Sequence, residues 1–284
     1  MLGTISPFWD GNEVWLVIAI STFYAAFPIA YSRLLLAFYL PLVLAILLFV
    51  FRAVSLEFSY SGRGISRIWL GVFSLSSFLA ATAGIGVISL VVSGIPTTPE
   101  GELLFPAASL LHPFALSFTL TGIFLITLHA LAYLVPKTDG PLTARIIRCA
   151  TGLWAIMLVM FLSNLLLLLG KDPTALAKPL VLAGMVTILA GMIVYRITLV
   201  KRAYRFLLIC SSLAVAGLWL MVTGLLFPNI INPVHGDSHV LTVYNTSAPT
   251  NSLILMVLTS VVGIAIVGGY TACVYRAFAE RRGK

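Results

Sequence analysis

The N-terminal stretch "WDGNEVW" carries two carboxylates, Asp10 and Glu13, directly before a long apolar segment. A third carboxylate, Glu57, lies in "FRAVSLEFSY" after a second apolar segment, five residues beyond Arg52. Carboxylates at the edge of a low-dielectric region can take up and release protons near neutral pH. One functional interpretation of these residue types is therefore a mouth through which protons enter an apolar environment.

Each of these residues also has a purely structural interpretation. Asp10 can cap a helix through its side-chain oxygen, with Glu13 three residues on as its partner in a capping box. Glu57 can be an ordinary interfacial residue paired with Arg52. Spacing alone favours the structural role for each residue.

The four histidines are candidates for binding a metal or a heme. His112 and His129 are 17 residues apart, which in a helix is about 26 Å of rise and about 260° of net rotation. They would face different directions near opposite ends of one helix, so they cannot ligate one heme together. Each alone could be an axial ligand, but a hydrogen-bonding role is the commoner one. His235 and His239 flank Gly-Asp, which indicates a polar loop rather than a metal pair, and no metal site is expected.

The composition indicates what kind of protein holds these residues. The hydrophobic fraction is 60% and the charged fraction is 9%, whereas soluble domains carry about 25% charged residues. Too few polar side chains are present to cover a soluble surface, so the chain must be surrounded by lipid. The net charge of +8 does not indicate a nucleic-acid partner, because the basic residues lie in short segments between apolar runs.

The apolar runs predict an all-α polytopic membrane protein that forms one integral membrane domain over residues 1–284. A spanning helix needs about 20 mostly apolar residues. Pro28 and Ser32 mark a predicted turn between the first two runs. About eight such runs are present, at residues 14–31, 34–51, 68–92, 110–135, 149–169, 179–199, 206–227 and 253–274.

The basic residues predict the orientation. With eight helices, 14 of the 17 Lys and Arg residues fall on the side that holds both termini. The positive-inside rule makes that side cytoplasmic. Arg33, Lys171 and Lys178 fall on the other side, together with the loop "PTTPEGELLF". Asp10 and Glu57 are therefore expected at the cytoplasmic face.

The helix centres are apolar apart from Asn164 and a few hydroxyl groups. Asn164 is expected to form an interhelical hydrogen bond, with lining a cavity as the alternative. A transporter or channel would need charged or polar residues near the bilayer midplane. The composition therefore counts against a transporter, which stays as an alternative beside a heme-binding membrane anchor that uses His112 or His129.

Several motifs resemble one family in the same order along the chain. The segment "PFWDGNEVWLV" is similar to the signature of subunit II of the cytochrome bd-type quinol oxidases, and "YAAFPIAYS" to the segment that follows it. "FRAVSLEFS" resembles its Phe-Arg and acidic stretch, and "HPFALSFTLTGIF" with "LHALAYL" its fourth-helix region. "LTVYNTSAPTNSLILMVL" resembles its last loop and helix. The first match is the most specific.

The resemblance implies a non-heme subunit of a quinol:oxygen oxidoreductase in a prokaryotic plasma membrane. The partner, subunit I, would carry two b-type hemes, one d-type heme and the quinol site, so this chain would hold no complete active site and no heme of its own. Asp10 and Glu57 match acidic positions on a proton path from the cytoplasm, and Trp15 matches the second tryptophan of the signature. Arg52, Asn12 and Glu13 are expected to support that path. A quinone could occupy this subunit as a bound ligand.

The sequence also departs from the family in two places. The family has a helix before the signature, with a Gly-Phe-Asp-like motif that has no counterpart here. A mis-assigned start codon, a small accessory chain that supplies the helix, and true divergence are the three explanations. His112 stands where the family commonly has asparagine.

Overall fold

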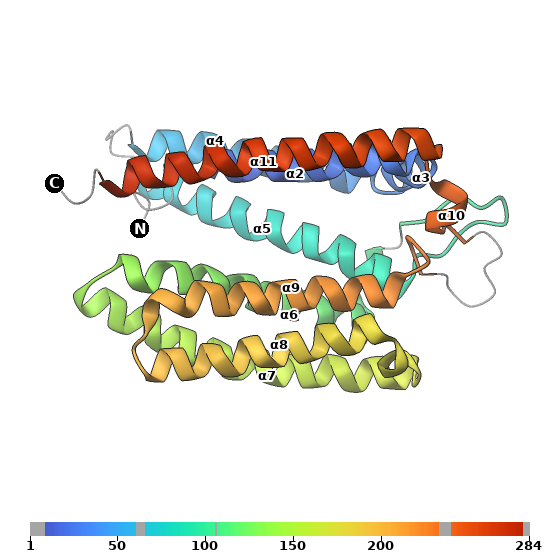
Figure 1. Cartoon of the computed structure of the whole chain (residues 1–284). Coiled ribbons are helices and arrows are strands. Elements are labelled where there is room, and N and C mark those ends of the chain that lie inside the picture. Colours follow the sequence, from blue (N-terminus) through green and yellow to red (C-terminus); the bar gives the residue numbers. More distant parts are fainter. Residues whose placement is uncertain (1–8, 61–65, 106, 233–239, 281–284) are drawn as a thin grey trace. The chain divides into compact units, whose positions relative to one another are not determined.

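The computed structural model describes residues 9–60, 66–105, 107–232 and 240–280. These residues form helices and, apart from two isolated β-bridges, no β-structure. Figure 1 shows the helices in chain order. They are α2 (Trp9–Ala26), α3 (Pro28–Ala37), α4 (Tyr39–Tyr60), α5 (Ser66–Ser93), η1 (Ala107–Leu111), α6 (Pro113–Leu134), η2 (Val135–Lys137), α7 (Gly140–Lys171), η3 (Ala175–Ala177), α8 (Pro179–Val200), η4 (Tyr204–Phe206), α9 (Leu207–Leu226), α10 (Val243–Thr246) and α11 (Thr250–Glu280).

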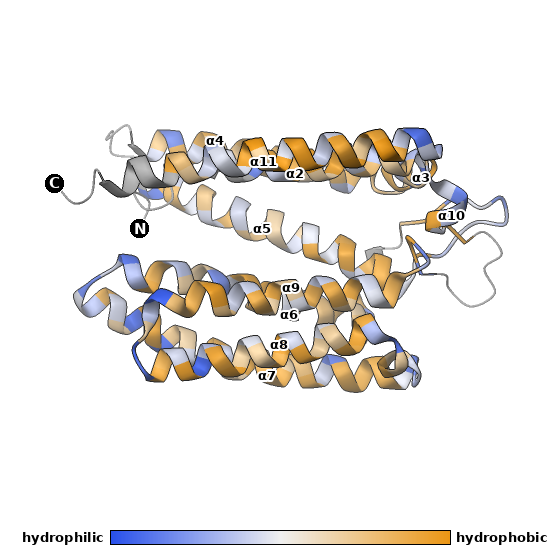
Figure 2. Cartoon of the chain, viewed as in Figure 1, coloured by the Kyte–Doolittle hydropathy of each residue, from blue (hydrophilic) through white to orange (hydrophobic). Residues whose placement is uncertain are grey.

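Seven helices of the described chain are long and apolar enough to cross a membrane, and a bent pair of helices makes up to eight. The bent pair is α2 with α3, which meet at 120°. In Figure 2 the long helices are apolar along most of their length, and hydrophilic residues gather at the turns between α6 and α7 and between α8 and α9. The prediction of an all-α polytopic membrane protein is confirmed.

The first two predicted spans were wrong in their boundaries. The chain does bend, by 120°, at the break between Ala26 and Pro28, where the turn was predicted. Ser32, however, lies inside helix α3, and α4 begins only at Tyr39. Proline is well accommodated at the first position of a helix, where its missing N–H would have no intrahelical partner. The hydrogen bond from Tyr31 N to Phe27 O (2.9 Å) forms in the first turn after the break.

The chain divides into two compact units, Met1–Leu35 with Val243–Lys284, and Leu36–Thr242. In the first unit the backbone N–H of Ala248 donates to Ala26 O (2.8 Å). This bond ties the end of α2 to the residues just before α11. The two helices therefore run antiparallel from that point, side by side in Figure 1.

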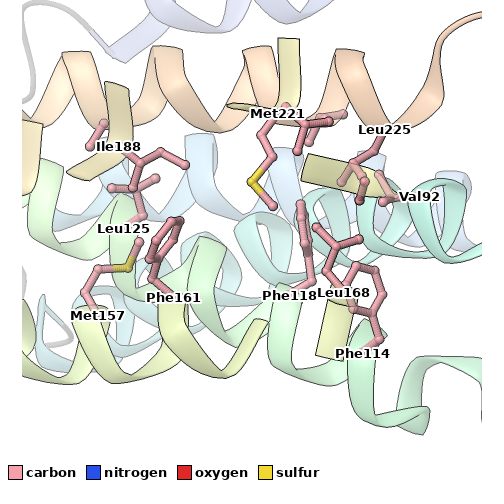
Figure 3. Close-up of a cluster of buried hydrophobic side chains, with 14 of the residues drawn as sticks. Val92, Phe114, Phe118, Leu125, Met157, Phe161, Leu168, Ile188, Met221 and Leu225 are labelled. Atoms are coloured by element: carbon pink, nitrogen blue, oxygen red, sulfur yellow. The ribbon is translucent and has the colours of Figure 1, made fainter. Parts of the chain in front are cut away.

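The second unit contains α4 to α9, and its central core lies among α5, α6, α7, α8 and α9. Lipid tails are as apolar as these side chains, so close van der Waals packing holds membrane helices together more than the hydrophobic effect does. Figure 3 shows the core side chains facing one another across the helices. They include Val92, Phe114, Phe118, Leu125, Met157, Phe161, Leu168, Ile188, Met221 and Leu225.

Helices α8 and α9 approach each other most closely along a glycine seam, made of Gly184 and Gly191 on α8 and Gly217 and Gly224 on α9. A Cβ added at Gly184 would lie 2.5 Å from Met221 N, and one added at Gly217 would lie 2.7 Å from Ile188 N. On each helix the two glycines are seven residues apart, so both lie on one face. The missing side chains let the two backbones touch.

Candidate functional site

The helices of the second unit run alternately up and down, so the α4–α5, α6–α7 and α8–α9 connections share one end. We call this end the basic end. Nine described Lys and Arg residues lie on or near these connections, whereas the opposite end has Lys171 and Lys178. The nine are Arg52, Arg67, Lys137, Arg145, Arg148, Arg196, Lys201, Arg202 and Arg205. The predicted segregation of charge therefore holds within this unit.

Glu57 lies on the last turn of α4, at the basic end, and its side chain is exposed. Its carboxylate forms no ion pair or hydrogen bond with the residues that the structure describes. The guanidinium of Arg52, half-buried on the same helix, lies 5.9 Å from the centre of the Phe73 ring of α5. Among the described residues Glu57 therefore does not form the pair with Arg52 that was raised as its structural alternative, and the carboxylate is open to solvent or to a partner.

Asp10 and Asn12 lie in the first turn of α2, which begins at Trp9. Asp10 is thus inside the helix rather than at its N-cap, although a carboxylate in the first turn still interacts favourably with the helix dipole. The side chains of Asp10 and Asn12 are outside the described part of the structure. Glu13 is half-buried, and Trp15 is 39% exposed on the surface of the unit. Asp10 and Glu57 belong to different units.

The two histidines of α6 lie near its opposite ends, as the sequence predicts. His112 is the N-cap of α6, is exposed and makes no side-chain capping bond. His129 Nδ1 lies 2.9 Å from Ser211 Oγ of α9. The Ser211 hydroxyl also lies within hydrogen-bond distance of Leu208 O (3.0 Å). If it donates there, His129 Nδ1 is the donor to Ser211 Oγ. His235 and His239 lie outside the described residues. Within the described chain, no three His, Cys, Asp or Glu side chains are grouped to hold a metal ion.

The interhelical hydrogen bond predicted for Asn164 is confirmed. Asn164 is buried on α7, and its Nδ2 donates to Ser117 O of α6 at 3.1 Å.

A polar cluster that was not predicted from the sequence caps the C-terminus of α5. The side chain of Asn232 donates to Val92 O (2.8 Å), its backbone N–H donates to Val91 O (3.1 Å), and Lys171 Nζ donates to Ser93 O. These bonds satisfy carbonyl groups that a helix end leaves without intrahelical partners. Gly94, with φ of 102°, directly follows the helix. That glycine is the only local signal of the cap.

The cytochrome bd terminal oxidase subunit II family model matches residues 1–278, nearly the whole chain. The chain belongs to this family. Among its relatives, the cytochrome bd ubiquinol oxidase subunit 2 of Bacillus subtilis (strain 168) is 24% identical over 99% of this chain and 84% of its own length. The cytochrome bd-I ubiquinol oxidase subunit 2 of Escherichia coli (strain K12) is 28% identical over 61% of this chain and 47% of its own length. The match thus spans about half of the Escherichia coli protein.

A solved structure, that of the bd oxidase from Geobacillus thermodenitrificans, has the same fold. It aligns with a TM-score of 0.79 at 17% identity and covers 98% of this chain and 84% of its own chain. Membership of the family makes this protein a subunit of a quinol:oxygen oxidoreductase. The prediction from the N-terminal signature is confirmed.

Proposed function

We propose that this chain is the heme-free subunit of its oxidase, bound to a larger subunit I that carries the hemes and the quinol site. The family match over residues 1–278 supports the assignment to subunit II. The extensive apolar surface of α4, including Leu44, Leu47 and Phe51, gives the second unit a face that lipid or a partner helix can cover. The same proposal includes a quinone bound in this subunit and a small accessory chain in the complex.

We place the basic end of the second unit at the cytoplasmic face of a bacterial plasma membrane. The positive-inside rule supports this orientation, since nine described basic residues lie at that end. With the predicted helix order, both termini lie on the same side. Asp10 and Glu57 then face the cytoplasm.

The proton role rests above all on Glu57, an exposed carboxylate at the basic end that no described side chain neutralises. Such a group can collect protons from water at the membrane surface and pass them inward. Asp10, in the first turn of α2, would serve the same path from the first unit. Trp15, Arg52, Asn12 and Glu13 would keep the surroundings of the two carboxylates in place.

The test is oxygen consumption by the assembled oxidase carrying Glu57→Gln or Asp10→Asn. Both changes keep the side-chain size and remove the titratable group. We expect normal heme content and a rate lower by roughly 10-fold, less than the ~10²-fold that direct proton transfer contributes, because surface water partly replaces an uptake group. Glu102→Gln is the matched control, since Glu102 is an exposed carboxylate in the loop at the opposite end. Full turnover in both variants would refute the proton role, and failure to assemble would make the residues structural.

A heme-binding role for this chain itself is the second candidate, and one observation favours it. In the tautomer in which His129 Nδ1 donates to Ser211, a neutral ring leaves the Nε2 lone pair available. This is the arrangement in which a histidine ligates a metal. A redox difference spectrum of the isolated chain separates the two candidates, since the first predicts no heme absorbance and the second predicts absorbance that His129→Ala removes.

A further inference from the structure

The pair of helices α6 and α7 holds a buried amide whose orientation is fixed by its neighbours. Asn164 is 4% exposed, and its Nδ2 lies 3.1 Å from Ser117 O, 3.0 Å from Met160 O and within hydrogen-bond distance of Thr121 Oγ1. Two of these acceptors are carbonyl oxygens, which would repel the amide oxygen. The nitrogen therefore must face them, and the oxygen must point elsewhere.

Two polar atoms at this place have no partner. Asn164 Oδ1 and Ser117 Oγ are both buried and form no hydrogen bond in the described structure. The Thr121 hydroxyl cannot serve Oδ1, because it donates its only proton to Ser117 O (2.8 Å). Lipid and apolar side chains cannot form hydrogen bonds with these two atoms, so leaving each of them unpaired destabilises the folded protein.

The two atoms are complementary. Ser117 Oγ has a hydroxyl proton to donate, and Asn164 Oδ1 has lone pairs to accept one. They belong to residues that already touch, because the amide nitrogen of Asn164 donates to the carbonyl oxygen of Ser117. A single small molecule that both accepts and donates hydrogen bonds would satisfy both atoms.

We propose that α6 and α7 enclose a water-binding site in which one ordered water accepts from Ser117 Oγ and donates to Asn164 Oδ1. Water fits because the surrounding polar groups are neutral amides, hydroxyls and carbonyls, and buried waters typically bind such groups. Asn164 lies seven residues before the end of α7 at Lys171, which is about 10 Å along the helix axis. The water thus lies inside the apolar layer, nearer the end that carries Lys171, and joins the two helices.

The direct test is a density map of the assembled oxidase at a resolution that shows ordered waters. The expected result is a peak within hydrogen-bond distance of both Ser117 Oγ and Asn164 Oδ1. An empty space between the two atoms, or a direct hydrogen bond from Ser117 to Asn164, would overturn the proposal. This measurement uses the unmodified protein, so it does not depend on whether a variant folds.

A variant gives an independent readout with opposite signs for the two cases. If the hydroxyl of Ser117 holds a water, Ser117→Ala should lower the Tm of the assembled oxidase by about 2–4 °C. If that hydroxyl is simply unpaired, its removal relieves a penalty, so an unchanged or raised Tm would contradict the proposal. Thr127→Val is the matched control on the same helix, because the Thr127 hydroxyl is exposed and bonds its own helix at Ile123 O (2.7 Å). The control should leave the Tm unchanged.

Discussion

The glycine seam between α8 and α9 should not tolerate a single added methyl group. In Gly184→Ala the new Cβ would lie 2.5 Å from Met221 N, 2.6 Å from Gly217 O and 2.9 Å from Met221 Cα. All three atoms are backbone, so no side-chain rotation can relieve the clash. The two helices must separate, and they then lose contacts along the whole seam.

The size of the effect follows from two opposing contributions. Overpacking of this kind costs about 1–3 kcal/mol. Replacing glycine by alanine within a helix returns about 1 kcal/mol of helix propensity. The net loss at Gly184 should therefore be up to about 2 kcal/mol. Gly152, on α7, has no atom within 4 Å of an added Cβ, so Gly152→Ala should stabilise the protein by about 0.5–1 kcal/mol.

The assay is thermal unfolding of the purified oxidase in one detergent, with Gly184→Ala and Gly152→Ala compared with the unmodified protein. We expect opposite shifts of the Tm. The double variant Gly184→Ala with Gly217→Ala should lose less than the sum of the two single losses, because helices that are already separated have room for the second methyl group. The reasoning is refuted if Gly184→Ala is tolerated as well as Gly152→Ala.

Three further predictions concern the membrane edge and the end opposite the basic end. Trp15→Ala should lower the Tm of the complex, because an exposed tryptophan near a helix end anchors the interface. Unaltered assembly and Tm would count against this role. Lys171→Met should cost about 1 kcal/mol by removing the donor to Ser93 O, and equal Tm values for variant and parent would disprove the cap. The hydrogen bond from the Thr174 hydroxyl, with help from Lys178, holds the pKa of Asp172 below its usual value. The stability that Asp172 contributes is therefore present above the usual carboxyl pKa and is lost as the pH falls through the lowered pKa of the folded protein. The Tm deficit of Asp172→Ala should therefore become smaller in acid. A deficit that does not change with pH would refute this role of Asp172.

Most of the helices could be predicted from the sequence because lipid demands long apolar runs, and six predicted spans each correspond to one helix. The region 14–51 could not be divided correctly. The bend near Pro28 was predicted, but hydropathy alone could not show that a short helix, α3, starts there and that α4 follows only at Tyr39. The glycine seam was also missed, although the seven-residue spacing of Gly184 and Gly191, and of Gly217 and Gly224, was visible in the sequence.

Some features of the candidate site could likewise be predicted from the sequence, and others could not. The position of Glu57 at the basic end followed from charge counting, which depends only on the order of apolar and basic segments. Its lack of an ion pair did not follow, because the Arg52 guanidinium lies over the ring of Phe73, a residue on another helix. Pairings that depend on neighbouring helices, such as His129 with Ser211 and Asn164 with Ser117, needed the fold.

The most direct test of the account is a reduced-minus-oxidised spectrum of the tagged chain, purified from its native membranes in mild detergent, with the copurifying proteins identified. We expect a larger partner with b- and d-type heme absorbance that is lost when the partner is stripped away. A chain that purifies alone and colourless would contradict the assignment to an assembled oxidase. A chain that purifies alone with heme would contradict the heme-free role and would point to His129.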